Sequence, residues 1–316
     1  MRVFVAGASG AIGQPLIAEL VRRGHTVTGM TRSEAGARRL RDLGASVAQI
    51  SAFDAPAVEE GIRRSQAEVV VDELTALPKH PSEMAAAAPG DQKLRLEGGG
   101  NLYRAAQANG VRRYIQQASG FFLRPGGGLA DESEGLAVDA SPRVAASART
   151  YAELEARVLS GGGMEGVALR YGFFYGPNTW YSLEGAAADQ AGRQELAIIG
   201  RGEGVWSWVH IEDAALATVA ALTAPAGVYN VVDDDPSPVS RWLPEFARWV
   251  GAPHPPQITE EDALRTAGAD AVYYGTKLRG ASNAKAKHVL HFRPRRLQWL
   301  QVGREAIGKN VVFLDT

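Results

Sequence analysis

The stretch that decides the fold is Gly7-Ala8-Ser9-Gly10-Ala11-Ile12-Gly13. It directly follows a strand-like apolar run, Arg2–Ala6, and opens a helix-like run, Ile12–Arg23. Glycines at this junction permit a tight turn, a close approach of pyrophosphate and close packing of helix on strand. The helix N-terminus then offers amide N–H groups and a positive dipole to phosphate. The context predicts a dinucleotide-binding turn, and a plain tight turn is the alternative.

Outward from this turn, short apolar runs alternate with helix-like segments over the first 170 residues. This alternation is typical of an α/β fold with a doubly wound parallel sheet. We predict a first domain over residues 1–176 and a smaller substrate lobe over 177–316, partly interleaved with the first. The expected strands are Arg2–Ala6, Thr26–Met30, Ser46–Ile50, Glu68–Asp72, Arg113–Ala118, Gly166–Tyr171 and Val228–Val232.

Further helices are expected over Gln92–Asn109, Ile211–Leu222 and Val239–Val250. Asp91 is placed to cap the first of these, and Gly110 to end it. Two low-complexity segments, Pro78–Gly90 and Arg124–Ala148, have the composition of loops over one edge of the sheet.

Composition excludes several classes of function. Lys and Arg total 34 against 35 for Asp and Glu, so neither a nucleic-acid groove nor a membrane-binding surface is indicated. The 316-residue chain has no cysteine, which removes disulfides, thiolate nucleophiles and thiolate metal sites. The histidines lack metal-ligand spacing, so no metal is expected. Without a signal-like or membrane-spanning segment, we expect a cytoplasmic protein.

Five motifs together resemble the extended branch of the short-chain dehydrogenase/reductase superfamily, the NAD(P)-dependent epimerases and dehydratases. They are Gly7–Gly13, Gly98–Leu102, Arg113–Ser119, Leu169–Tyr171 with Tyr175–Pro177, and Trp208–Ala215. The resemblance covers nearly the whole chain. It implies a Rossmann-type sheet, a nicotinamide cofactor and a C-terminal substrate lobe.

The choice of cofactor depends on the end of the second strand, Gly29-Met30-Thr31-Arg32-Ser33. An acidic residue there would bind a ribose 2′-hydroxyl, and an arginine would bind a 2′-phosphate. Arg32 therefore favours NADP(H), and NAD(H) is the alternative. Arg32 is otherwise a solvated residue at the start of a helix, without a role in cofactor binding. The cofactor-binding residues expected are Gly7, Ser9, Gly10, Ala11, Ile12, Gly13, Arg32, Leu74, Thr75 and Tyr171.

The catalytic centre departs from the family pattern. The resemblance implies a Ser or Thr after the fifth strand, matched by Ser119, and a Tyr with a Lys four residues later. Tyr151 is the nearby tyrosine, but Glu155 stands where Lys is required, and a carboxylate there would raise the phenol pKa. A second alignment places Ser147 at the tyrosine position and Tyr151 at the lysine position. In both, the supporting asparagine is replaced by Arg95, and Ser119 and Tyr151 are the catalytic candidates.

The substrate pocket also departs from that of sugar-nucleotide enzymes. Phe173 and Trp206 stand where the resemblance implies polar groups that bind a diphosphate. Aromatic side chains cannot neutralise two phosphates, but they can line an apolar pocket. The substrate-binding residues expected are Phe121, Phe173, Trp180 and Trp206, with core packing as the alternative for each.

Two functions of different classes remain. The first is an NADP(H)-dependent oxidoreductase or epimerase with a degenerate Tyr–Lys pair, acting on a small, non-nucleotide, partly apolar carbonyl or alcohol. The second is a non-catalytic NAD(P)-binding sensor or scaffold. The expected partner is a small-molecule substrate, with a homodimer as the assembly considered.

Overall fold

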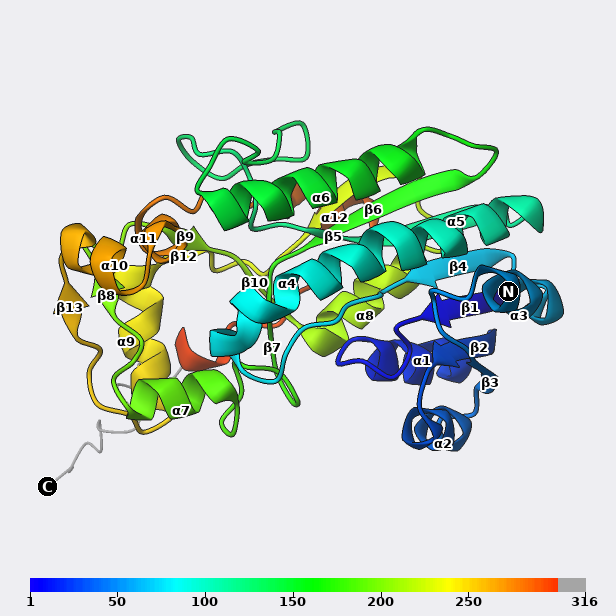
Figure 1. Cartoon of the computed structure of the whole chain (residues 1–316), viewed down its shortest axis with the longest axis horizontal. Coiled ribbons are helices and arrows are strands. Elements are labelled where there is room, and N and C mark those ends of the chain that lie inside the picture. The colour runs from blue at the N-terminus through cyan, green and yellow to red at the C-terminus, as the bar shows by residue number, and fades with distance from the viewer. Residues whose placement is uncertain (301–316) are drawn as a thin grey trace, which may run out of the picture.

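A seven-stranded parallel sheet forms the centre of the protein, seen here in a computed structural model that describes residues 1–300 (Figure 1). The strand order is β11-β6-β5-β4-β1-β2-β3, and each neighbouring pair is parallel. The strands are β1 (Arg2–Ala6), β2 (Thr26–Thr31), β3 (Ser46–Gln49), β4 (Val69–Asp72), β5 (Arg113–Ser119), β6 (Glu165–Tyr171) and β11 (Gly227–Val231). The predicted doubly wound α/β fold is confirmed.

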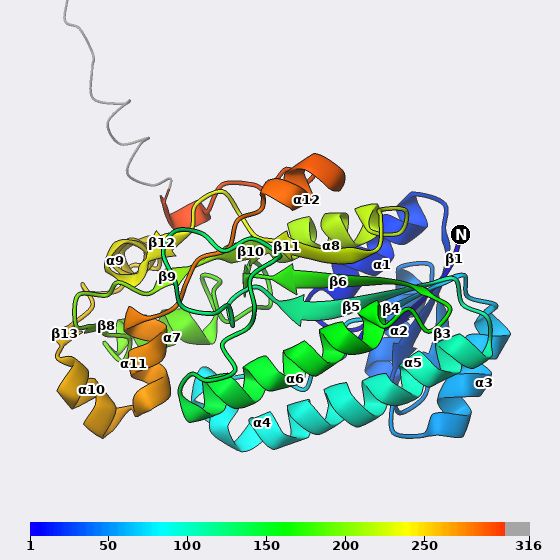
Figure 2. The same ribbon diagram turned by 90° about the horizontal axis from the view of Figure 1, so that it is seen from above.

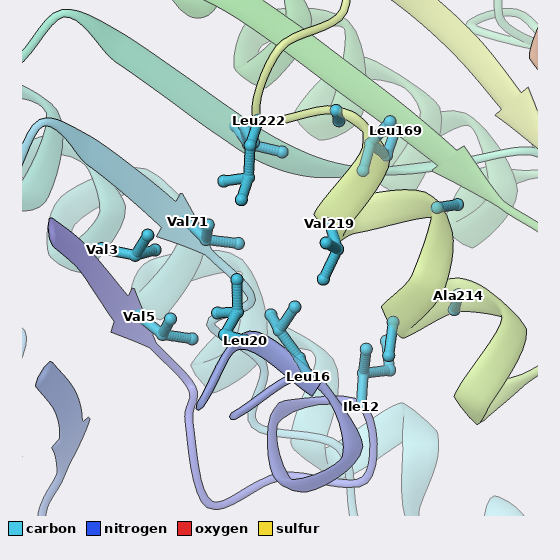
Figure 3. Packing of buried hydrophobic residues seen from close by; sticks show 14 of the residues in the cluster. Val3, Val5, Ile12, Leu16, Leu20, Val71, Leu169, Ala214, Val219 and Leu222 are labelled. Atoms are coloured by element: carbon cyan, nitrogen blue, oxygen red, sulfur yellow. The ribbon is translucent and has the colours of Figure 1, made fainter. Parts of the chain in front are cut away.

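Helices cover both faces of this sheet (Figure 2). One face carries α1 (Gly13–Arg22), α2 (Glu34–Asp42), α8 (Ile211–Ala220) and α12 (Ala284–Val289). The other carries α3 (Ala55–Ser65), α5 (Gly99–Ala108) and α6 (Pro142–Leu159). Alternate strand residues supply the two cores: Val3 and Val5 pack with Leu16 and Leu20 of α1 on the first face (Figure 3), and Phe4 packs on the second.

The C-terminal lobe packs at the carboxyl edge of the sheet around a cluster of aromatic rings. Its core includes Tyr175, Trp208, Trp242, Phe246 and Trp299. The lobe's helices are α7 (Ala186–Gly192), α9 (Val239–Trp249), α10 (Glu260–Thr266), α11 (Ala269–Thr276) and η3 (Gln298–Leu300). Its two-stranded pairs join β7 (Phe173–Tyr175) to β10 (Trp208–His210), β9 (Val205–Trp206) to β12 (Ser237–Pro238), and β8 (Ile198–Ile199) to β13 (Gln257–Ile258).

The predicted lobe, 177–316, includes residues 301–316, which lie outside the described residues. Within the described part, β11, α8 and α12 follow residue 177 in the chain and yet belong to the central sheet and its helical layer. The C-terminal lobe is therefore assembled from β7 and the remaining segments after residue 177.

Three local predictions are wrong. Pro78–Gly90 is not a loop: after η1 (Pro81–Glu83), α4 spans Met84–Lys93 because its alanines strongly favour helix. Arg124–Ala148 is a loop only up to Ser141, because Pro142 begins α6 at the first helical position, where proline is favoured. Asp91 does not cap a helix, because α4 has already begun upstream of it.

No helix among residues 1–300 combines the length and apolar character needed to cross a membrane. In the same part of the chain, acidic residues and histidines do not gather in groups of three or more that would hold a metal ion.

Candidate active site

The glycine turn between β1 and α1 has no room for side chains. Gly7 has a φ of +75°, and a Cβ added there would lie 2.3 Å from the carbonyl oxygen of Glu73. A Cβ on Gly13 would lie 2.4 Å from the Gly7 oxygen. No side chain caps the first turn of α1, where the Gln14 amide donates to the Gly10 carbonyl at 3.2 Å. These features fit the pyrophosphate of a dinucleotide.

The end of β2 presents a cation and hydroxyl groups beside this turn. Arg32 is exposed and makes no hydrogen bond or ion pair within the described residues. The hydroxyl oxygens of Ser9 and Thr31 lie 3.2 Å apart. The nearest carboxylate in the sequence, Glu34, pairs with Arg41 at 3.2 Å. The arrangement therefore offers donors and no acidic residue to an adenosine ribose.

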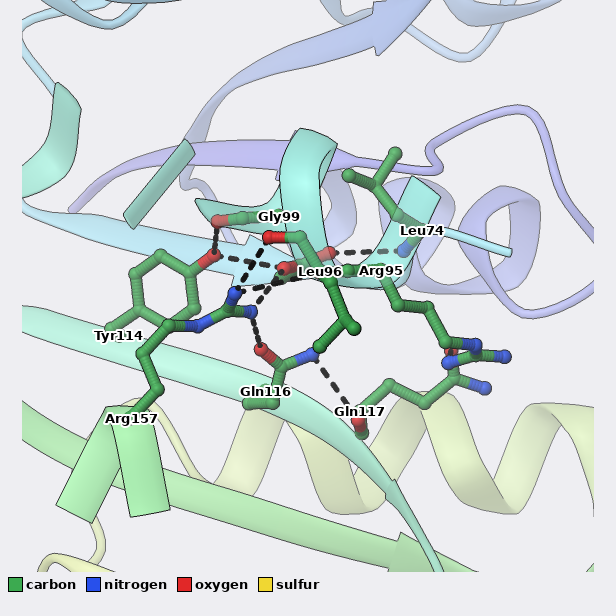
Figure 4. Close-up of polar contacts among 9 residues, drawn as sticks. Leu74, Arg95, Leu96, Gly99, Tyr114, Gln116, Gln117 and Arg157 are labelled. Atoms are coloured by element: carbon green, nitrogen blue, oxygen red, sulfur yellow. Dashed lines mark hydrogen bonds and ion pairs between the residues drawn. The ribbon is translucent and has the colours of Figure 1, made fainter. Parts of the chain in front are cut away.

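Buried polar networks support the carboxyl end of β4, where Leu74 and Thr75 follow the strand. Asp72 accepts hydrogen bonds from the Tyr114 hydroxyl at 2.8 Å and from the Leu74 amide at 3.1 Å. Arg157 of α6 lies 3.9 Å from the same carboxylate and donates to Gln116 (Figure 4). These contacts fix the strand end rather than offer free groups to a ligand.

Glu73, which sequence analysis missed, lies buried beneath the glycine turn. Its Oε1 is 3.0 Å from the hydroxyl of Tyr171, which in turn lies 2.6 Å from Thr218 Oγ1. Burial raises the pKa of Glu73 to about 8, so this carboxyl group is neutral at pH 7. The hydroxyl of Tyr171, expected to bind cofactor, is thus engaged inside the protein.

Ser119 ends β5 opposite Tyr171 of β6, at the carboxyl edge of the sheet. It is 1% exposed, and its hydroxyl accepts a weak hydrogen bond of 3.4 Å from the Phe121 amide. Open α/β sheets bind ligands at this edge. Ser119 is therefore held in the region where a reacting group would lie, with its own proton available for donation.

Tyr151 lies in α6 with its ring centroid 5.7 Å from that of Phe122 and 5.0 Å from Cζ of Arg95. Burial raises the pKa of the Tyr151 phenol, and the Arg95 cation opposes this increase. The prediction that Glu155 raises the pKa of Tyr151 is wrong, because the Glu155 carboxylate forms an ion pair with Arg170. The two form a buried bidentate pair at 2.7 and 2.8 Å.

Arg95 is the second group that sequence analysis did not assign to the site. It lies in a π-helical turn, η2 (Leu94–Gly98), a form of helix often found at functional sites. Its side chain is 3% exposed, and its Nε donates to Asp91 Oδ2 at 2.7 Å. The signal available in the sequence was an arginine at the position of the supporting asparagine.

Three of the four predicted substrate-binding aromatics come together. The Phe173 ring stacks between Phe121, at 4.1 Å between centroids, and Trp206, at 3.9 Å. We call Phe121, Phe173 and Trp206 the aromatic stack. Each is partly exposed. Within residues 1–300, no ring contact joins Trp180 to this stack. The indole N–H of Trp180 donates instead to the Pro78 carbonyl at 3.2 Å.

Comparison with known proteins agrees with this geometry. The model of the NAD dependent epimerase/dehydratase family matches residues 3–232. The chain belongs to this family. A relative from a Streptomyces species, a 3-diazoavenalumate denitrifying reductase, is 38% identical over 98% of this chain and 100% of its own length. A 2-alkyl-3-oxoalkanoate reductase of Stenotrophomonas maltophilia is 26% identical over 80% of this chain and 77% of its own.

Solved structures of family enzymes share the fold at low identity. The Thermus thermophilus UDP-glucose 4-epimerase with NAD has a TM-score of 0.73 and 23% identity, and covers 95% of this chain and 96% of its own. A dTDP-glucose 4,6-dehydratase from Streptomyces venezuelae with NAD has a TM-score of 0.73 and 18% identity, and covers 97% and 98%. The family places this chain among NAD(P)-dependent reductases and epimerases, and the predicted family and enzyme class are confirmed.

Proposed function

We propose that this family member is an NADP(H)-dependent reductase of a small, aromatic, non-nucleotide substrate. The observation that carries the proposal is the aromatic stack at the carboxyl edge of the sheet, next to Ser119. Because the three stacked rings are each partly exposed, their exposed edges would contact the ring of an aromatic substrate. In this proposal residues 1–176 bind the cofactor and the C-terminal lobe contributes to substrate binding.

The hydride acceptor that best suits the site is an aromatic diazo carbon. The bound nicotinamide would supply a hydride with its electron pair. A carbonyl oxygen must also gain a proton, and no lysine follows Tyr151 at the fourth position, since Glu155 stands there and pairs with Arg170. At a diazo carbon, the C–H bond forms as the C–N bond breaks and N₂ leaves with that bonding pair, so no proton donor is required. The name of the Streptomyces relative supports this acceptor.

The direct test combines NADPH with a stable aromatic diazonium salt and the purified protein. We expect NADPH oxidation, release of N₂ in equal amount and replacement of the diazo group by hydrogen. Deuterium from 4-deuterated NADPH should appear on the ring carbon. Turnover without N₂ release, or no turnover, would contradict the proposal.

A carbonyl is the second candidate acceptor. Ser119 and Tyr151 retain a hydroxyl and a phenol at the expected elements, and the Stenotrophomonas relative is named as a reductase of a 3-oxo acid. Since burial raises the pKa of Tyr151, its phenol would act as an acid, which favours carbonyl reduction over alcohol oxidation at neutral pH.

Arg32 is proposed to select NADP(H), since it is exposed beside the turn and has no ion-pair partner among residues 1–300. Replacing Arg32 by alanine should weaken NADPH binding about ten- to a hundredfold, because a charge-assisted contact to the 2′-phosphate is lost. NADH binding should hardly change. Calorimetric titration with both cofactors measures this, and Arg38→Ala, an exposed arginine of α2, is the matched control. Equal affinities of the parent protein for both cofactors would exclude the assignment.

Nucleoside-diphosphate sugars are expected not to react, although structural neighbours act on them. Phe173 and Trp206 stack on each other and carry no charge that would bind a diphosphate. A screen of UDP- and dTDP-sugars, with product detection by mass spectrometry, checks this expectation. Epimerisation or dehydration of any of them at ordinary enzymatic rates would overturn the account of the pocket.

A further inference from the structure

The guanidinium of Arg95 is a buried cation with unused hydrogen-bonding capacity. Its Nε donates to Asp91, and its Nη1 is 3.5 Å from Gln117 Oε1, at the limit of a hydrogen bond. Its Nη2 has no hydrogen-bond partner within residues 1–300. Although the residue as a whole is buried, Nη2 keeps contact with solvent and can donate to a ligand.

The carboxylates around Arg95 are each held by more than one group. The two carboxylate oxygens of Asp91 have different partners: Oδ2 accepts a hydrogen bond from Arg95, and Oδ1 accepts one from the Ala76 amide at 2.6 Å. Asp72 is already engaged by Tyr114, Leu74 and Arg157. Glu73 is neutral at pH 7 because burial raises its pKa. Arg95 and Asp91 thus form a direct ion pair at 2.7 Å, and an incoming carboxylate would bind the remaining donors of the guanidinium without displacing Asp91.

Arg95 also lies at the proposed reaction centre. Asp91, the ion-pair partner of Arg95, accepts a hydrogen bond from the Ala76 amide. Ala76 directly follows Thr75, which is predicted to bind the cofactor. Gln117 precedes Ser119 by two positions on β5. The Tyr151 ring, 5.0 Å from the guanidinium, packs near Phe122, whose ring is 4.6 Å from Phe121 of the aromatic stack. A continuous series of contacts thus links the cation to the stack.

We propose that Arg95 binds the carboxylate of an aromatic acid whose ring lies on the aromatic stack. A planar guanidinium matches a carboxylate, and the long contact to Gln117 is weak enough to be replaced. The inference rests on the proposed function and narrows it: the substrate is an aromatic carboxylic acid, and Arg95 is a specificity-determining residue.

The test measures binding rather than turnover. Cinnamate and methyl cinnamate share a ring and a side chain but differ in charge, and each is titrated calorimetrically into the protein saturated with NADP⁺. We expect cinnamate to bind about ten- to a hundredfold more tightly than the ester, as one charge-assisted contact implies. Arg95→Gln should remove this ratio and leave ester binding within about threefold, whereas Arg95→Lys should keep part of it.

Loss of Arg95 leaves Asp91 without its partner, so a second variant guards against misfolding. Asp91→Asn with Arg95→Gln removes both charges and retains an oxygen for the Ala76 amide. This double variant should also bind cinnamate and methyl cinnamate with similar affinities. Its melting temperature should stay close to that of the parent protein. An unchanged ratio in these variants, or no cinnamate binding by the parent, would overturn the proposal. A ratio that depends on Arg95 in a protein that reduces no aromatic substrate would instead contradict only the proposed function.

Discussion

Replacing Glu155 by alanine should lower the free energy of unfolding by about 3–5 kcal/mol, because it leaves the Arg170 cation buried without a counter-ion. The two side chains are 9% and 5% exposed, and they join α6 to the central strand β6 through two hydrogen bonds. Arg170 also donates to the Glu134 carbonyl of the loop before α6, so a disturbed guanidinium would loosen that loop. Urea denaturation with a two-state fit measures the change.

Glu153→Ala is the matched control on the same helix, since Glu153 is exposed and forms no ion pair within the described chain. It should change the free energy of unfolding by less than about 0.5 kcal/mol. Glu155→Met with Arg170→Met removes both charges and should cost much less than Glu155→Ala alone. A loss below about 1 kcal/mol for Glu155→Ala would show that the pair is not needed by the fold.

The fold was predictable because its signals are local. The glycine turn, the strand-like runs and the position of Ser119 each depend on a few consecutive residues. The prediction of a loop at Pro78–Gly90 is wrong because the low complexity of this segment comes from an alanine run, and alanine favours helix even beside Pro89. Local rules conflict in such a segment, and packing against the rest of the protein decides between them.

The electrostatics of the site were not predictable, because the partners lie far apart in the sequence. Glu73 and Tyr171 are 98 residues apart, and Arg95 reaches Tyr151 from a different helix. Sequence spacing alone made Glu155 a neighbour of Tyr151, since residues four apart share a helix face. In the structure Glu155 pairs with Arg170, and Arg95 is the cation that lies beside the phenol of Tyr151. Sequence analysis thus names most groups of the site without showing which of them interact.

Replacing Tyr151 by phenylalanine should separate the two candidate acceptors. Reduction of an aromatic ketone should fall about 10²–10⁴-fold, because the phenol is the proposed proton donor for the alkoxide. Reduction of an aromatic diazonium should stay within about threefold, because no proton from the enzyme is needed when N₂ leaves. Rates measured under saturating NADPH, with both substrates and both proteins, provide the comparison.

Ser119→Ala is the companion variant, since its hydroxyl would orient a substrate oxygen but has no role at a diazo carbon. It should slow ketone reduction and spare diazonium reduction, whereas NADPH affinity should survive both substitutions. The ring of Tyr151 packs between Phe122 and Arg95, and phenylalanine preserves that packing. A change of rate is therefore attributable to the hydroxyl. If Tyr151→Phe slows both reactions equally, the phenol does more than donate a proton. If it slows neither reaction, the proton for ketone reduction comes from water or another group. The second outcome would agree with the alignment that places Ser147 at the tyrosine position.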